Sequence, residues 1–385
     1  MENEGETTQG LIPVRDPGPD EPEEGVALCL SGGGYRAMLF HLGGIIRLNE
    51  IGHLQKIARV SSVSGGSITA GVLGLAWQQL EFGIGGIASN LDELVVEPIR
   101  KLAGRTIDNP AIIWGLLLPW RTAPGMLASY YAKYLFGDTT LQDLPDDSKR
   151  EGPRFVFNAT NVQTGKLFRF SRPYQGDYSV GLWRDPFTRV ADAVAASTAF
   201  PPTLSPYTPK PSGMFDESTE GSNKDEIFRK KLWLTDGGVY DNLGLETAWK
   251  RYRTLLVSDA GAPLGVDPEP HRNWIQHAIW VSDIVDDQVR ALRKRQLIDC
   301  YERTVRTGSY WGIRSDVASY ELGDPFPFPR ERIERAQGVP TRFAALDATT
   351  QTDLIDWGYV IADTSLRRWV YPLVPRPLRL PATEG

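Results

Sequence analysis

The chain has 385 residues, of which 41% are hydrophobic and 23% charged, a composition typical of a soluble globular protein. Its net charge of −6 argues against a nucleic-acid-binding protein, and its only two cysteines, Cys29 and Cys300, exclude a disulfide framework. No run of about 18 apolar residues predicts a membrane-spanning helix, and no spacing typical of metal ligands occurs. We therefore expect a cytoplasmic protein that needs no metal or cofactor and whose contact with any membrane is peripheral.

The sequence divides into three predicted regions. Residues 1–25 are rich in Glu, Pro, Gly and Asp and are predicted to be a mobile acidic leader. Residues 26–262 alternate apolar strands with helices, which indicates an α/β catalytic domain: a three-layer sandwich with a mostly parallel central sheet. Residues 263–385 are predicted to be a helical extension packed on the same domain. The apolar insertion near 111–120 is too short to cross a bilayer and is predicted to be a buried helix, with a lid or a membrane-dipping element as the alternative.

The expected elements follow from hydrophobic periodicity and from glycine or proline at their ends. Strands are predicted over 26–30, 58–63, 155–160, 167–170, 231–234 and 254–258. Helices are predicted over 35–49, 67–80, 91–102, 185–198, 274–303 and 352–357 or a little beyond, the third with a break or kink at Pro98. The Pro- and Ser-rich segment 203–224 is predicted to be a loop.

Two glycine-dense turns follow the first two predicted strands, and each leads directly into a helix. The first, which we call the first glycine turn, contains Gly32, Gly33 and Gly34. Glycines before a helix allow backbone N–H groups to approach an anion, so this turn is a candidate oxyanion hole. Arg36, in the first turn of the following helix, either adds positive charge to this site or pairs with an acidic residue.

The second turn, Ser62-Val63-Ser64-Gly65-Gly66, carries a candidate nucleophile. A serine on a sharp strand-to-helix turn presents its hydroxyl, provided that its neighbours are small. Ser62 stands where the G-x-S-x-G pattern has its first glycine. Taken alone, Ser64 is equally compatible with an ordinary helix N-cap.

A serine nucleophile needs a base, and two candidates come from different parts of the chain. The order Ser64, Asp236, His271 matches that of a hydrolase triad, but no strand end or glycine turn positions His271. Asp236 follows a predicted strand and opens Asp236-Gly237-Gly238, which places its carboxylate at the carboxyl edge of a sheet. A desolvated carboxylate beside a serine is able to accept its proton.

The first glycine turn also permits a nucleotide-binding interpretation. G-G-G-Y-R-A satisfies the G-x-G-x-x-A fingerprint after a strand, and Glu50 would then have to contact the ribose. Glu50 directly follows the predicted helix, however, and does not end a second strand. A nucleotide-binding oxidoreductase and a non-catalytic binding protein on a hydrolase fold are therefore kept as alternatives.

Together, S-G-G-G-Y-R-A, the serine turn about 30 residues later and D-G-G-V-Y-D-N-L-G resemble the patatin-like phospholipases, relatives of cytosolic phospholipase A2. The resemblance covers roughly residues 26–260. It implies a Ser64–Asp236 dyad without histidine and an oxyanion hole at Gly32, Gly33 and Gly34. The segment 195–201, which ends at Pro201, is similar to a family block near the site.

The resemblance implies a lipid acyl hydrolase of the phospholipase A or lysophospholipase type, acting through an acyl-enzyme. Its expected partners are an acyl-ester lipid and, transiently, a membrane surface. Arg36, Gly65, Gly237, Gly238 and Pro201 are predicted to bind substrate or to support the catalytic residues.

Overall fold

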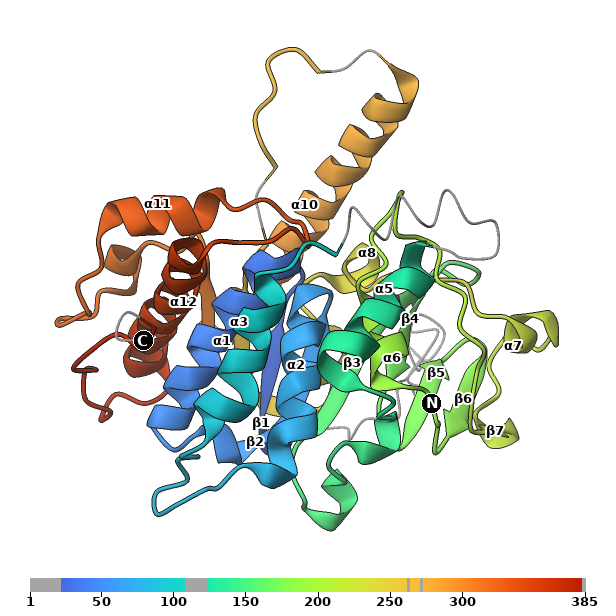
Figure 1. Ribbon diagram of the computed structural model, residues 1–385, viewed down its shortest axis with the longest axis horizontal. Coiled ribbons are helices and arrows are strands. Elements are labelled where there is room, and N and C mark those ends of the chain that lie inside the picture. The colour runs from blue at the N-terminus through green and yellow to red at the C-terminus, as the bar shows by residue number, and fades with distance from the viewer. Residues whose placement is uncertain (1–21, 108–122, 262–263, 271–272, 383–385) are drawn as a thin grey trace, which may run out of the picture.

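The computed structural model describes residues 22–107, 123–261, 264–270 and 273–382, so the predicted insertion near 111–120 and most of the predicted leader lie outside the described residues. A ten-stranded sheet runs through the centre of the molecule (Figure 1). Among the described residues, no helix is both long and apolar enough to cross a membrane.

The first part of the sheet is parallel, with the strand order β10-β9-β1-β2-β3. Its strands are β1 (Glu23–Leu30), β2 (Ile57–Val63), β3 (Arg154–Asn161), β9 (Tyr252–Asp259) and β10 (Thr307–Gly312). β1 begins at Glu23, inside the predicted leader, because Glu23 pairs with Tyr252 of β9. The carboxyl ends of these strands meet at one edge of the sheet, which is where open α/β folds place their sites.

The second part of the sheet continues antiparallel from β3, in the order β4-β5-β6-β7. Its strands are β4 (Lys166–Phe170), β5 (Tyr174–Asp177), β6 (Gly181–Arg184) and β7 (Met214–Asp216). β8 (Leu234–Asp236) pairs antiparallel with β3 outside this path. The hairpin of β3 and β4 was predicted, whereas β5, β6, β7 and β10 were not.

Alternate residues of β1 face two separate hydrophobic layers. Leu28 and Leu30 belong to the core that contains α1 (Gly34–Glu50), α2 (Gly65–Ala76) and α12 (Ala348–Trp369). Ala27 and Cys29 belong to the core beneath α9 (Glu246–Trp249) and α10 (Trp274–Glu302). This period-two alternation places helices on both faces of the sheet. The predicted α/β fold with a mostly parallel central sheet is confirmed.

The remaining helices include α3 (Glu97–Ala103), α5 (Ala123–Tyr131), α6 (Val190–Ser197), α7 (Ile227–Lys230), α8 (Gly238–Asp241) and α11 (Arg330–Gly338). The prediction of one helix over 185–198 was too long, because the chain enters α6 only at Val190 after leaving β6. The helix predicted over 91–102 does not end at Pro98, but it is irregular just before this residue. Asp92–Val96 is a π-helical turn that leads into α3, and Pro98 lies in the first turn of α3.

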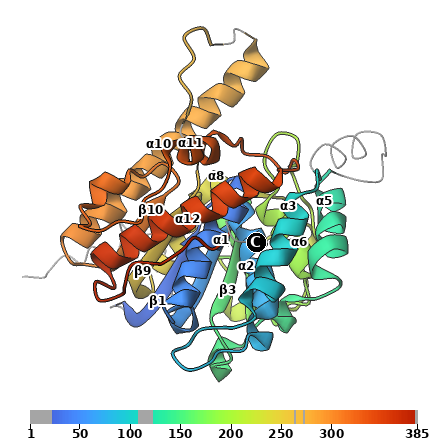
Figure 2. The same cartoon turned by 60° about the vertical axis from the view of Figure 1, so that its left-hand side comes forward.

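Two further predictions placed elements incorrectly. α12 has 22 residues, although the helix was predicted near 352–357 or a little beyond, because its buried face includes Asp353, Asp356 and Asp363. Arginines bind these carboxylates and allow them to lie in the core: Arg332 binds the first two, and Arg47 binds the third. The strand predicted at 231–234 runs instead from Leu234 to Asp236, so Asp236 is its last residue. Figure 2 shows α12 lying across α1.

Candidate active site

Ser64 stands at a sharp junction between β2 and α2, with φ 50° and ψ −122°. Non-glycine residues rarely adopt a positive φ, so this conformation is strained and is held by its surroundings. The two following residues must be glycine, because a Cβ on Gly65 would lie 2.1 Å from the Gly34 carbonyl oxygen and one on Gly66 would lie 2.6 Å from that of Leu30. The second turn therefore packs directly against the first glycine turn.

A cluster of serine hydroxyls supports this junction. The Ser64 N–H donates to Ser197 Oγ at 3.0 Å, and Ser197 Oγ donates to the Asn158 carbonyl at 2.7 Å. Ser62, which replaces the first glycine of the elbow pattern, is fully buried and donates to the Val156 carbonyl at 3.2 Å. Its hydroxyl also accepts a hydrogen bond from Ser67 at 3.0 Å. A serine is thus accommodated at position 62 with its hydroxyl satisfied.

Asp236 is fixed at the end of β8 by main-chain contacts with the segment after α6. Its N–H donates to the Ala199 carbonyl at 2.9 Å, and its own carbonyl accepts a hydrogen bond from Thr160 Oγ1 at 2.9 Å. The predicted block 195–201 therefore supports Asp236 through Ala199. Pro201 opens the turn that follows this contact.

The Asp236 carboxylate is 2% exposed and only partly satisfied. Oδ1 accepts a hydrogen bond from the Gly238 N–H at 2.7 Å, whereas no described residue gives Oδ2 a hydrogen bond of standard geometry. Burial is the main cause that raises the pKa of Asp236 to about 7. Hydrogen bonds from the Gly238 amide and the Ser64 hydroxyl lower this pKa, and the charge of Asp286 raises it further. Asp236 is therefore a buried carboxyl group next to the Ser64 hydroxyl that changes charge near neutral pH.

The three glycines of the first turn are not equivalent. The Gly32 N–H donates to the Asn242 carbonyl at 3.1 Å and is therefore occupied. In the described part of the chain, no acceptor is found for the N–H groups of Gly33 and Gly34, which have φ of 140° and 59°. Gly34 is the first residue of α1, so both free N–H groups lie at the positive end of a 17-residue helix.

The Asn242 side chain contacts both the first glycine turn and the Asp236-Gly237-Gly238 turn, and it was not singled out from the sequence. A Cβ on Gly32 would lie 2.3 Å from Asn242 Oδ1 and 3.2 Å from Ser64 Cβ, and one on Gly238 would lie 2.9 Å from the same amide oxygen. The Asn242 side chain therefore lies between the first glycine turn and the Asp236-Gly237-Gly238 turn. The D-N-L-G after D-G-G-V-Y was the available signal, but nothing in it distinguishes Asn242 from an ordinary turn residue.

Arg36 hydrogen-bonds to chain segments that pack beside the first glycine turn. Its guanidinium donates to the carbonyls of Ala260 and Val339 at 2.8 and 2.7 Å and to Thr341 Oγ1 at 2.8 Å. Burial lowers the pKa of this side chain to about 10. Gly237 is also a packing position, since a Cβ there would lie 2.2 Å from the Asn158 carbonyl oxygen.

The histidines that the structure describes lie in other settings. His41 is buried in α1 between Ser258 Oγ at 2.7 Å and the Ser31 carbonyl at 2.9 Å, and burial lowers its pKa to about 4. The His53 ring packs on the Tyr371 ring, and His277 is exposed on α10. His271, the alternative base, lies outside the described residues.

The nucleotide-binding alternative required Glu50 to reach a ligand at the first glycine turn. Glu50 ends α1, and Gly34 begins it, so the length of the helix, about 24 Å, separates them. Glu50 binds Arg47 at 2.7 Å and accepts a hydrogen bond from the Tyr359 hydroxyl. Glu50 is therefore too far from the first glycine turn for the ribose contact that the nucleotide-binding alternative requires.

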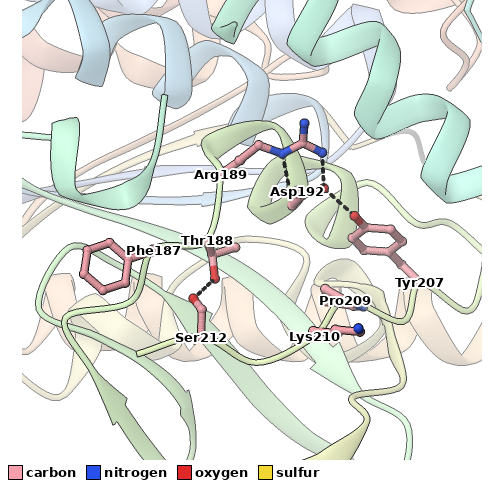
Figure 3. Close-up of a pocket in the computed structure, with 8 residues that line it drawn as sticks. All are labelled: Phe187, Thr188, Arg189, Asp192, Tyr207, Pro209, Lys210 and Ser212. Carbon is pink, nitrogen blue, oxygen red and sulfur yellow. Dashed lines mark hydrogen bonds and ion pairs between the residues drawn. The ribbon is translucent and has the colours of Figure 1, made fainter. Parts of the chain in front are cut away.

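A cavity of about 320 Å³ lies away from Ser64 and Asp236. It opens at the N-terminal end of α6, where the Tyr207 hydroxyl donates to Asp192 and Thr188 bonds to Ser212 (Figure 3). Ser197, which supports Ser64, is at the opposite end of this helix. No group of three or more metal-ligating side chains gathers within the part of the chain that the structure describes.

Solved structures of a human enzyme share this fold. Human GIVD cytosolic phospholipase A2 matches with a TM-score of 0.53 and 13% identity over 90% of this chain and 59% of that chain. Its complex with methyl gamma-linolenyl fluorophosphonate matches with a TM-score of 0.53 and 14% identity over 90% and 58%. The chain thus spans less than two thirds of the length of these structures. No curated protein matches it in sequence.

A family model matches more than half of the chain. The model described as patatin-like phospholipase matches residues 28–249, a range that includes the first glycine turn, Ser64 and Asp236. Because this range is more than half of the 385 residues, the chain belongs to the patatin-like phospholipase family.

Proposed function

We propose that this protein is a lipid acyl hydrolase of the phospholipase A or lysophospholipase type that uses a Ser64–Asp236 dyad. The observation that carries the proposal is the strained Ser64 beside a buried carboxylate that has one unpartnered oxygen and a pKa raised to about 7. A base with a pKa near the working pH combines a large ionised fraction with adequate proton affinity. The family and the human relatives, named as phospholipases, support an ester lipid as the substrate.

In the acylation step, Ser64 Oγ attacks the carbonyl carbon of the acyl ester while Asp236 accepts the hydroxyl proton. The negative charge that develops on the carbonyl oxygen is stabilised by the N–H groups of Gly33 and Gly34, an electrostatic contribution of about 3 kcal/mol per donor in other acyl-transfer enzymes. Gly32 is omitted from this role because Asn242 already accepts its N–H. When the tetrahedral intermediate collapses, the ester bond breaks and the alcohol leaves with the proton from Asp236.

In the deacylation step, a water molecule attacks the acyl-Ser64 carbonyl and transfers its proton to Asp236. The same two amides stabilise the second oxyanion. Its collapse releases the fatty acid and returns the proton to Ser64 Oγ. This mechanism gives each turn one role: the first glycine turn binds the oxyanion, the second presents the nucleophile, and the Asp236 turn supplies the base.

Covalent labelling with a long-chain alkyl fluorophosphonate tests the proposal, since the human relative was solved in complex with such a compound. The wild-type protein should be labelled at Ser64, as identified by peptide mass spectrometry, and should release fatty acid from a lysophospholipid. Ser64→Ala should abolish both. Ser67→Ala is the matched control, because Ser67 lies three residues away in the same hydroxyl cluster and has no catalytic role in the mechanism.

Two results would contradict the dyad. Full activity in Asp236→Asn together with its loss in His271→Ala would transfer the role of base to the histidine. An unlabelled wild-type protein that co-purifies with NAD(P) would instead favour a nucleotide-binding oxidoreductase, and one that neither reacts nor turns over esters would favour a non-catalytic binding protein.

A further inference from the structure

The N-terminal half of α10 is an apolar helix tip that projects from the body of the protein. Figures 1 and 2 both show it standing clear of the other labelled elements. From Asn273 to Ser282 the sequence contains ten residues without a carboxylate, lysine or arginine, among them Trp274 and Trp280. We call these ten residues the apolar tip. Its helix begins with a side-chain cap, in which Asn273 Oδ1 accepts a hydrogen bond from the Ile275 N–H at 3.0 Å.

Exposed apolar side chains lie around most of the circumference of this half of α10. Trp274 is 78% exposed, and the other exposed apolar residues here are Ile275, Ile279, Val281, Ile284 and Val285. Ile275 and Ile284 are nine residues, or about two and a half turns, apart and so lie on opposite sides. Pairing with a second copy would require a narrow stripe at heptad positions. Apolar residues on all sides are typical of a helix surrounded by an apolar medium.

The other half of α10 lies beside the candidate active site. Arg293 Nη2 donates to the Tyr240 carbonyl of α8 at 3.3 Å, and Arg293 Nη1 donates to Glu246 at 3.3 Å. α8 directly follows Asp236 and Gly237, and its Val239 is exposed. α10 thus joins the apolar tip to the edge of the sheet at which Ser64 and Asp236 lie.

We propose that the apolar tip inserts into the surface of a zwitterionic lipid bilayer and docks the candidate active site against it. This inference rests on the proposed function in that the bilayer would also hold the substrate. The first charges that follow the tip along α10 are the carboxylates Asp283, Asp286 and Asp287, which an anionic surface would repel and a zwitterionic one would not; the cations of α10 begin further along, at Arg290.

The length and the residue types of the apolar tip fit insertion into the surface of a bilayer. Ten helical residues span about 15 Å, which exceeds the depth of about 5 to 10 Å at which interfacial segments lie. Tryptophan prefers the boundary between headgroups and acyl chains, and both Trp274 and Trp280 lie in the tip.

Vesicle flotation tests the proposal in the Ser64→Ala background, which prevents hydrolysis of the vesicles. The full chain should float with phosphatidylcholine vesicles, and the triple variant Trp274→Gln, Ile275→Gln, Val281→Gln should lower the partition coefficient by at least about tenfold. Glutamine is a good helix former, so α10 should persist, as circular dichroism would verify.

The matched control replaces one tryptophan and two aliphatic residues that are exposed outside α10: Ile84→Gln, Trp369→Gln and Leu373→Gln. Its partition coefficient should stay within about twofold of the parent. The proposal is overturned if the parent does not float, if the tip variant floats as well as the parent, or if both triple variants lose binding equally. Binding that requires phosphatidylglycerol, or a dimer that the tip variant converts to a monomer, would also overturn it.

A comparison of wild type with the tip variant, both containing Ser64, separates docking from catalysis. With Ser64 restored, the tip variant should hydrolyse a soluble short-chain ester at the wild-type rate but lose about tenfold in the hydrolysis of phosphatidylcholine vesicles. If wild type hydrolyses neither ester, the proposed function fails while docking is still decided by flotation. If flotation fails but both esters are hydrolysed equally by the two proteins, docking fails and the proposed function stands.

Discussion

Asp236, the last residue of β8, and Asp241, five residues later, differ in how many hydrogen bonds their carboxylate oxygens accept. Asp236 and Asp241 are both buried, and burial raises the pKa of each. Both oxygens of Asp241 are occupied: Oδ1 accepts from the Leu243 N–H at 3.2 Å and Oδ2 from the Glu246 N–H at 2.7 Å. For Asp236, Oδ1 accepts from the Gly238 N–H, whereas no described residue gives Oδ2 a hydrogen bond of standard geometry.

This difference separates a structural carboxylate from a reactive one. Asp241 organises the start of α9 and lies 3.7 Å from Arg293, so its charge is compensated within the protein. The pKa of Asp236 is shifted by burial, the Gly238 amide, the Ser64 hydroxyl and the charge of Asp286, none of which is a cation. No described residue gives its Oδ2 a hydrogen bond of standard geometry. Burial alone therefore does not identify the base; the incomplete set of partners does.

The largest expected effect is on turnover in Asp236→Asn. Asparagine keeps the size of the side chain and still accepts the Gly238 N–H, but it is unable to take the Ser64 proton. We expect kcat for a soluble ester to fall by up to about 10⁴-fold, the upper range for loss of a general base. In Asp241→Ala, kcat per folded molecule should fall by less than about tenfold. Equal losses in the two variants would contradict the distinction between the two turns.

The same two variants should change stability in opposite directions. Asp241→Ala leaves the N–H groups of Leu243 and Glu246 buried without an acceptor, which should lower the free energy of unfolding by about 2 to 4 kcal/mol. Asp236 has a folded-state pKa above its unfolded value, so its burial costs stability once pH rises from about 4 towards 7. Asp236→Asn should therefore raise the free energy of unfolding by about 1 to 4 kcal/mol at pH 8.

Urea unfolding of both variants at pH 8 and pH 4 measures these changes. The gain in Asp236→Asn should fade at pH 4, where wild-type Asp236 is protonated, while the loss in Asp241→Ala should persist. A gain that does not depend on pH would show that burial of the Asp236 charge is not its cause.

The pH dependence of kcat/KM should report the ionisation of Asp236. Activity requires the charged carboxylate, so kcat/KM for a soluble ester should rise with a midpoint near pH 7 and fall about 50-fold between pH 7 and 5. Asp286 raises the pKa of Asp236, so Asp286→Asn should move the midpoint to lower pH. A midpoint that is unchanged in Asp286→Asn would assign the titration to another group.

Local sequence patterns predicted some elements and site residues of this molecule and missed others. Ser64, Asp236 and the first glycine turn were predicted because each lies at or near the end of a predicted strand and because the three motifs together resemble one family. The parallel core was predicted from the apolar runs of its strands. The meander β5–β7 was missed because its strands are three or four residues long. α12 was shortened because buried aspartates with distant arginine partners interrupt its apolar pattern.

Distant contacts account for the rest of what the sequence did not predict about the site. Arg36 was predicted to bind substrate or to support the catalytic residues, and local sequence pattern does not decide between these roles because its partners Val339 and Thr341 are some 300 residues away. The occupied N–H of Gly32 likewise depends on Asn242, 210 residues further along the chain. Sequence motifs thus predicted which residues meet, whereas which of their polar groups stay free depends on long-range packing.

The smallest effect we predict is that of Ser197→Ala, which tests whether the free oxygen of Asp236 needs a fixed Ser64 beside it. Ser197 Oγ accepts the Ser64 N–H and thereby helps to hold the strained backbone, but it touches neither reacting oxygen in the proposed mechanism. Losing this contact should reduce kcat by about three- to tenfold with little change in KM, because orientation is impaired while binding is not. Ser197→Thr, which keeps the hydroxyl, should recover part of the loss. If Ser197→Ala instead raises KM at constant kcat, Ser197 contributes to substrate binding, and the position of Ser64 does not depend on it.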